Sequence, residues 1–241
     1  FYGSWSPPFL LLLIFSTVLD FSLGRALGPE ERPGRRRVLL CLSLLGNLGV
    51  LAFFKYSHLF LDIWAVLPGG SAPGETAFPR RDDLLIPLGI SFYTFQSMSY
   101  TIDVYRRRIQ PSADFLEFSL FVSFFPQLIA GPVMRASELL PQIREQRRAN
   151  ETDMLIGAEL FLVGAFKKVV IADHVAPLVD AVYASGAQPV SAEVWVAGYA
   201  FALQIYCDFS GYTDIARGVA SLLGVKLVYN FDLPYFSTSP S

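Results

Sequence analysis

Residues 9–23 read FLLLLIFSTVLDFSL, an apolar run in which Asp20 is the one charged side chain. A helix needs about 20 mostly apolar residues to cross the hydrocarbon core of a bilayer. The run is bounded by Pro7-Pro8 and Gly24 and is short for a full crossing, so Asp20 near its end predicts a position close to a membrane surface. Segments of the same character recur along the chain, and together they decide the fold class.

The second apolar run extends from residue 38 to about residue 67, which is too long for one upright crossing at 1.5 Å per residue. Lys55 and His58 predict that the membrane part covers 38–54 and that 60–67 lies along the surface. Further candidate segments are residues 84–104, 115–134, 154–170, 194–206 and 215–228. The sequence therefore predicts an all-α, polytopic transmembrane protein with re-entrant and interfacial helices.

The composition agrees with a membrane protein. Of 241 residues, 53% are hydrophobic and 17% are charged, against about 25% charged residues in soluble domains. The formal net charge of −2 gives no case for binding nucleic acid. Cys41 and Cys207 are too few for a disulfide framework or a zinc site, and we expect buried, unreactive thiols. The sequence predicts no metal site and no bound cofactor.

Arginines between the segments indicate the orientation. They crowd residues 25–37 and 106–108, and the positive-inside rule places both connections in the cytoplasm. Strict alternation then fails, because a basic connection also follows segment 115–134. That segment contains Pro126 and Gly131-Pro132, which break a helix and free backbone groups. We predict that it re-enters and leaves on the cytoplasmic side; a conventional kinked span is the alternative.

Several ionisable residues lie in or beside apolar segments, where such groups are costly. Lys167-Lys168 interrupts segment 154–170, and we predict that both side chains snorkel to an interface, with 169–182 lying flat as an amphipathic stretch. We expect Asp103 to form a simple ion pair with the arginines at 106–108. His58 and His174 are expected to be surface or packed histidines.

Residues 204–217 read QIYCDFSGYTDIAR, a polar stretch between two apolar ones. Gly211 can supply a tight bend. A polar break at membrane depth is typical of the lining of a cavity, tunnel or substrate path. The alternative is an ordinary solvated loop in which Asp214 caps the next helix.

Taken together, five blocks of the sequence resemble the membrane-bound O-acyltransferase family. The blocks are IPLGISFYTFQ (86–96) leading to YTIDVYR (100–106), FVSFFPQLIAGP (121–132), FKKVVIAD (166–173), YCDFSGYTDIA (206–216) and NFDLPYF (230–236). The most similar branch is the alginate O-acetyltransferase type, a relative of the D-alanyl transfer proteins of Gram-positive cell walls. The resemblance implies a partial fold of that family in a multi-pass protein of the bacterial inner membrane.

The resemblance also implies a chemistry. An acetyl or other acyl group would pass from acetyl-CoA or a similar thioester to a hydroxyl of an exopolysaccharide such as alginate, or to a carrier protein. The bilayer and polysaccharide-modification or export proteins are the expected partners. The family's tunnel would be shaped by Gln127, Pro132, Tyr206, Asp208, Tyr212 and Asp214.

The family's catalytic histidine is expected beyond the end of this chain, and further spans before its start. The chain therefore resembles a fragment that is inactive by itself, and no catalytic residue is assigned within it. Two other classes stay open from composition alone: a transporter or channel, and a non-catalytic membrane assembly partner. A transporter should show an internal repeat, and none is visible between the two halves of the sequence.

Overall fold

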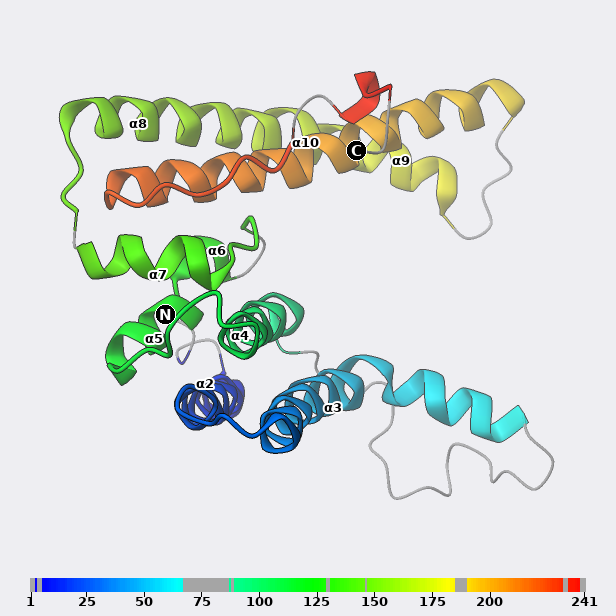
Figure 1. Ribbon diagram of the computed structural model, residues 1–241. Helices are drawn as coiled ribbons and strands as arrows, with labels where there is room; N and C mark the ends of the chain where they lie inside the picture. Colours follow the sequence, from blue (N-terminus) through cyan, green and yellow to red (C-terminus); the bar gives the residue numbers. More distant parts are fainter. Residues whose placement is uncertain are drawn as a thin grey trace. The chain divides into compact units, whose positions relative to one another are not determined.

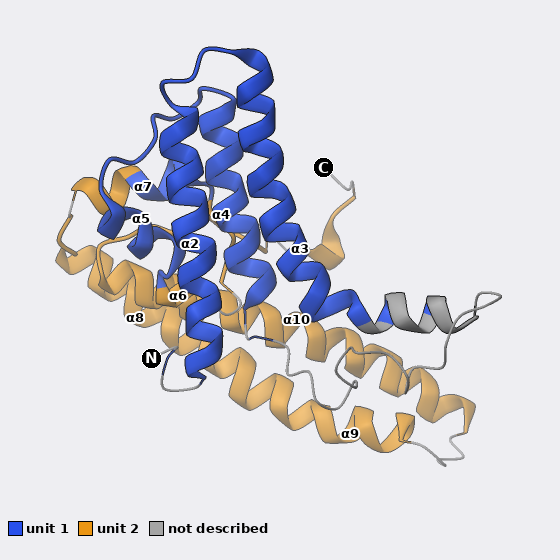
Figure 2. Ribbon diagram, turned by 90° about the horizontal axis from the view of Figure 1, so that it is seen from below, with its two compact units in different colours: residues 1–124, 135–140 blue, residues 125–134, 141–241 orange. Residues whose placement is uncertain are grey.

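The computed structural model describes residues 3, 6–66, 87, 89–128, 131–145, 147–184, 190–231 and 234–238. Within these ranges the chain is helical, with no strand, which confirms the predicted all-α class (Figure 1). The chain divides into two compact units. Unit 1 comprises 1–124 and 135–140, and unit 2 comprises 125–134 and 141–241 (Figure 2).

Unit 1 is built on three long helices, α2 (Pro7–Leu27), α3 (Pro33–Val66) and α4 (Ile90–Tyr105), each of which packs against the other two (Figure 2). The short helix α5 (Phe115–Val122) packs on α2 and α4. The predicted segment 84–104 thus becomes a helix from Ile90 onward, and its first residues lie largely outside the described ranges. Helix α3 does not end at Lys55 but continues to Val66.

A fully buried carboxylate joins the three long helices. Asp20 of α2 accepts hydrogen bonds from Ser43 Oγ (2.5 Å) and Asn47 Nδ2 (2.7 Å) of α3, and from Ser97 Oγ and Thr101 Oγ1 (3.1 Å) of α4. Four donors can satisfy both carboxylate oxygens, which makes burial of this group tolerable. Asp20 therefore faces the neighbouring helices α3 and α4, and its predicted position close to a membrane surface stays a prediction.

The outward faces of α2 and α3 are apolar. Among the described residues, Pro7–Leu27 and Pro33–Ser57 are long and apolar enough to cross a bilayer. In the most apolar 18-residue stretch of each helix, however, only 33% and 17% of the residues are buried within the protein. Leu11 and Leu45 are 68% and 70% exposed. Water would disfavour such contiguous apolar faces, whereas lipid accommodates them. The two helices therefore support association of the protein with a membrane.

The predicted membrane segment 115–134 is broken into short pieces. Helix α5 ends at Val122, α6 covers only Phe125–Leu128, and residues 131–135 are not helical before α7 (Ala136–Glu145) begins. Eight residues of helix rise only about 12 Å, less than half of a bilayer core. Segment 115–134 is therefore not one helix, and both re-entry on the cytoplasmic side and the alternative of a kinked span stay predictions.

Unit 2 is built on one long helix, α10 (Ser191–Leu222), which packs along α8 (Glu151–Ala165), the π-helix η1 (Phe166–Ala172) and α9 (Asp173–Tyr183). Both parts of this arrangement correct the sequence analysis. Lys167-Lys168 does not interrupt the helix, which widens there into η1 and then continues as α9. Segments 194–206 and 215–228 belong to one helix as far as Leu222, so the alternative of a solvated loop in which Asp214 caps the next helix was wrong.

Paired glycines bring α10 and α8 into close contact where the sequence predicted a bend. A Cβ on Gly211 would lie 2.7 Å from the carbonyl oxygen of Gly164, and one on Gly218 would lie 2.7 Å from that of Gly157. Helices can approach this closely only where side chains are absent. Gly211 therefore serves a helix contact, and the prediction that it makes a tight bend was wrong.

The helix contact predicts opposite effects for two Gly-to-Ala changes. Gly164→Ala would place a Cβ 2.5 Å from the carbonyl oxygen of Gly211, so we expect a loss of about 1–3 kcal/mol, as for other overpacked sites. Gly198→Ala in α10 meets nothing within 4 Å and should gain up to about 1 kcal/mol from helix propensity. Thermal unfolding midpoints in detergent would measure both, and equal effects would contradict the close contact.

The carboxylate junction of unit 1 gives a second stability prediction. Asp20→Ala would leave four buried donors without their acceptor, each worth about 1 kcal/mol or more. We expect a clear drop in the unfolding midpoint of the detergent-solubilised protein, partly restored in Asp20→Asn, which keeps one carbonyl oxygen. Asp180→Ala, at an exposed position of α9, is the control. An Asp20→Ala midpoint equal to that of the control would show that the junction contributes nothing.

Candidate functional site

The polar residues of α10 meet a lysine from the π-helix. Lys167 Nζ of η1 donates to Ser210 Oγ at 2.9 Å and to Asp214 Oδ2 at 2.7 Å. The Asp214 side chain is 13% exposed and that of Lys167 is 24% exposed. An ion pair removed this far from water needs close geometry and added hydrogen bonds to be favourable, and Ser210 supplies one of them.

A second cation shares the same carboxylate. Arg217 Nη1 lies 3.5 Å from Asp214 Oδ1, and its guanidinium lies over the ring of Tyr229 at 4.6 Å. Lys167 Nζ is likewise 5.9 Å from the ring centre of Tyr206. Two cations thus flank one carboxylate, and each contacts an aromatic face that stabilises positive charge. The cluster of Lys167, Ser210, Asp214 and Arg217 is called the α10 network below.

The chain after α10 folds back along the same helix. Phe231 packs edge-on against Tyr206 and Phe209, with ring centres 6.2 Å and 5.0 Å apart. Tyr235 in η2 (Pro234–Phe236) lies 5.8 Å from the ring of Tyr206 and donates its hydroxyl to the carbonyl of Ala202 at 2.7 Å. The rings of Phe231 and Tyr235 thus lie beside the α10 network.

A separate ion cluster lies next to the network along η1. Lys168 Nζ is 2.7 Å from Asp208 Oδ1 and 2.7 Å from Asp173 Oδ1. The Asp208 and Asp173 side chains are 53% and 50% exposed, so this cluster contributes little to stability. Both lysines of η1 therefore pair with carboxylates of α10. That they snorkel to an interface, with 169–182 lying flat, stays a prediction.

Of the six predicted tunnel residues, Asp214 belongs to the α10 network, and the ring of Tyr206 lies beside it, 5.9 Å from Lys167 Nζ. Asp208 belongs to the exposed cluster with Lys168, and Tyr212 is half-buried on α10. Gln127 in α6 and Pro132 are buried, and neither polar atom of the Gln127 amide has a hydrogen-bond partner among the described residues. Whether these six line a tunnel stays a prediction.

Sequence reasoning missed Lys167 as a partner of Asp214 because the two are 47 residues apart. The spacing of Ser210, Asp214 and Arg217 did carry a signal, since residues three and four apart share one helix face. Reading 204–217 as a broken segment hid that signal. Helical spacing therefore brings Ser210, Asp214 and Arg217 together on α10, and tertiary packing adds Lys167 from η1.

The described histidine and cysteines differ in exposure and lie outside the α10 network. His174 is exposed, with Nδ1 2.9 Å from the carbonyl oxygen of Val169, as predicted for a surface histidine, and the His58 side chain lies outside the description. Cys207 is buried as predicted, but Cys41 is exposed, so that prediction was wrong: Cys41 lies on the outward face of α3. Among the described residues no group of three or more His, Cys, Asp or Glu is placed to hold a metal.

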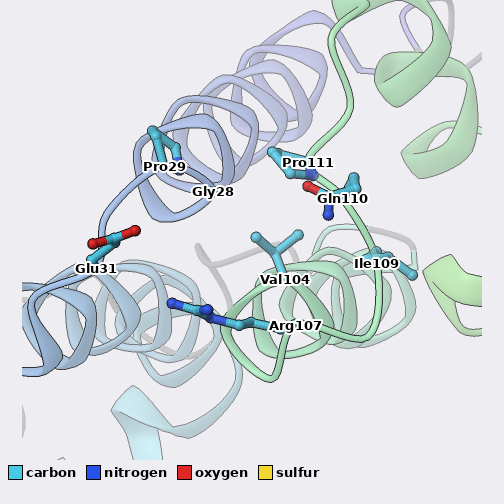
Figure 3. A pocket seen from close by; sticks show the side chains of 8 residues that line it. All are labelled: Gly28, Pro29, Glu31, Val104, Arg107, Ile109, Gln110 and Pro111. Atoms are coloured by element: carbon cyan, nitrogen blue, oxygen red, sulfur yellow. The ribbon is translucent and has the colours of Figure 1, made fainter.

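Asp103 forms the predicted ion pair in unit 1, with Arg108 Nη1 at 3.7 Å. A small hollow of about 210 Å³ lies nearby between the end of α2 and the turn after α4 (Figure 3). Glu31, which follows α2, and Arg107, which follows α4, both line it, and Gly28 touches Pro111 so closely that a Cβ would be 2.5 Å from its ring. The hollow holds one charge of each sign and no converging set of polar groups.

A larger hollow of about 440 Å³ in unit 2 lies where α8 begins and α10 ends. Asn150 caps α8 by accepting from the backbone N–H of Asp153 at 2.8 Å, and Asp153 Oδ2 in turn accepts from the N–H of Asn150 at 3.1 Å. Arg147 Nη2 completes the pair with Asp153 Oδ2 at 2.5 Å. The Asn150 N–H, followed by the charge of Arg147, holds the pKa of the Asp153 carboxyl below its usual value of 3.8.

The chain is similar in sequence to several acyltransferases. No family model matches the chain. The peptidoglycan O-acetyltransferase of Helicobacter pylori is 33% identical over 98% of this chain and 48% of its own length. A probable alginate O-acetylase AlgI of Pseudomonas aeruginosa is 37% identical over 99% of this chain and 45% of its own length. The teichoic acid D-alanyltransferase of Streptococcus thermophilus is 28% identical over 76% of this chain.

The chain belongs to the membrane-bound O-acyltransferase family, as the resemblance of its five blocks predicted. It spans about half the length of the curated relatives that it matches.

The capped aspartate predicts how stability depends on pH. Because the folded-state pKa of Asp153 is lowered, its contribution is fully present above about pH 4 and is lost as the pH falls through the folded-state pKa. The unfolding midpoint of Asp153→Asn should therefore lie below that of the parent at neutral pH, and the gap should close under acid conditions. Thermal unfolding from neutral pH to below pH 4 tests this. A gap that stays constant would contradict the assignment.

Proposed function

We propose that the protein containing this chain is an O-acyltransferase that moves an acetyl group to a hydroxyl of a polysaccharide such as alginate. The observation that carries this proposal is the 33–37% identity, over 98–99% of the chain, to a peptidoglycan O-acetyltransferase and an alginate O-acetylase. A carrier protein is the second acceptor we consider. The names of the three relatives share acyl transfer, which favours an enzyme over a transporter or a non-catalytic assembly partner.

The donor in this proposal is acetyl-CoA or a similar thioester. Polysaccharide-modification or export proteins are the proposed partners. We further propose a multi-pass location in the bacterial inner membrane. Two membrane-capable helices, α2 and the first part of α3, support this location. The arginines at 25–37 and 106–108 support a cytoplasmic position for the connections that follow α2 and α4.

Within this proposal the α10 network positions groups and does not transfer protons. Asp214 holds Lys167 and Arg217 in place, and the two cations leave the network with a positive excess. Fixed positive groups in a site with little water interact strongly with negative or polar parts of a substrate. We therefore propose that the network orients part of the donor or acceptor along α10. A proton-accepting histidine is not assigned among the described residues.

Replacing the shared carboxylate tests the proposal. Asp214→Asn keeps the shape but removes the charge that holds Lys167 and Arg217, so we expect about a tenfold loss of acetyl transfer, as for a displaced positioning group. The full-length protein would be expressed in alginate-producing cells that lack their own O-acetylase, and base-labile acetate on the polymer would be measured. Asp180→Asn, on the exposed face of α9, is the matched control.

Two outcomes would count against this prediction. If the parent protein adds no acetate to the polymer, the proposed acceptor is wrong. If Asp214→Asn is made at the parent level and acetylates normally, the α10 network has no positioning role. Elution of the purified variant on size-exclusion chromatography separates a functional loss from a folding defect.

A further inference from the structure

The hollow at the end of the α8–α10 pair carries an excess of positive charge. Its lining includes Arg147, Arg217 and Lys226, against one carboxylate, Asp153. Asp153 is already engaged by Arg147 at 2.5 Å. The next carboxylate, Asp214, is 3.5 Å from Arg217 and is shared with Lys167 at 2.7 Å. Counting these neighbours as well, four cations face two carboxylates, so the site has a net charge of +2.

The lysine of this hollow is held in place by its main chain. The Gln142 side chain donates to the carbonyl of Lys226 at 3.1 Å and accepts from its N–H at 2.8 Å. Just before it, Gly224 turns the chain with φ +79°, and a Cβ there would lie 2.4 Å from the carbonyl oxygen of Arg147. This contact brings the segment after α10 against the segment before α8. Lys226 and Arg147 are therefore placed together by structure that does not depend on their own charges.

Arg217 links the hollow to the α10 network. Its side chain is 18% exposed, and its Nε is buried with no hydrogen-bond partner among the described residues. A guanidinium with an unused donor beside two further cations matches the oxygens of a phosphate group. The hydroxyl of Ser221, which also lines the hollow, donates to the carbonyl of Asp153 at 2.9 Å.

The surroundings of the hollow are apolar. Ile156, Leu160 and Leu227 line it, and Leu155, Leu222 and Leu223 nearby are 73%, 39% and 48% exposed. A cationic hollow with apolar walls, beside exposed apolar side chains of α8 and α10, fits an amphiphile better than a free ion. Basic pockets between membrane helices recognise acidic lipid headgroups in this way.

We propose that this hollow binds the phosphate of an anionic phospholipid headgroup. Arg147, Arg217 and Lys226 contact the phosphate oxygens, and the apolar lining contacts the start of the acyl chains. The volume of about 440 Å³ accommodates a headgroup. This site lies beyond the proposed acyl transfer, since it recognises a membrane component and requires no reaction.

Binding of defined lipids to the purified full-length protein tests the proposal. Native mass spectrometry would follow titration with phosphatidylglycerol and, separately, with phosphatidylcholine. We expect several-fold tighter binding of phosphatidylglycerol, and Lys226→Gln should reduce that preference about tenfold, as expected for a lost charge-assisted contact. Gln142→Leu, which releases the Lys226 main chain, should reduce it less. Arg35→Gln, a basic side chain of unit 1 that is 69% exposed, is the matched control.

Three results would overturn the proposal. Equal binding of the two lipids would show that the hollow does not select negative charge. A preference unchanged in Lys226→Gln would place the lipid elsewhere. Displacement of phosphatidylglycerol by inorganic phosphate, at concentrations equal to those of the lipid, would show that the site recognises a free phosphate. Because each readout is lipid binding, none depends on whether the protein transfers acetyl groups.

Discussion

A charge that leaves water must be given partners by its neighbours, and this constraint organises both units of the protein. In unit 1, Asp20 is enclosed by four side-chain donors from α3 and α4, so the three long helices share one polar junction. In unit 2, Asp214 is enclosed by Lys167, Ser210 and Arg217. The apolar faces of these helices are interchangeable in lipid, whereas the polar junctions specify which helix meets which.

The second constraint is distance. Lys167 can reach Asp214 because α8 and α10 approach closely at Gly157, Gly164, Gly211 and Gly218. Beyond Ala165 the helix widens into η1 and turns both lysines toward carboxylates of α10. π-helical segments of this kind often occur at functional sites. Close packing and a widened turn thus act together to place the α10 network.

The family and the geometry support one account of what this part of the molecule does. The names of the three relatives share acyl transfer but refer to different polymers, namely peptidoglycan, alginate and teichoic acid. A rigid polar network on α10, flanked by aromatic rings, is suited to orienting a substrate. The cationic hollow, where we propose that an anionic headgroup binds, lies at the end of the same helix.

The sequence by itself determined the helical class, the membrane association and the family, because hydrophobic runs and motif blocks are local properties of the chain. It also marked Asp214 as a polar residue between two apolar stretches. It did not determine that Gly211 lies inside a continuous helix, since glycine serves equally for a bend and for a close contact, and only the position of Gly164 decides between them. The partners of Asp20 and Asp214 were likewise decided by tertiary structure, because a buried charge is satisfied by residues distant in sequence.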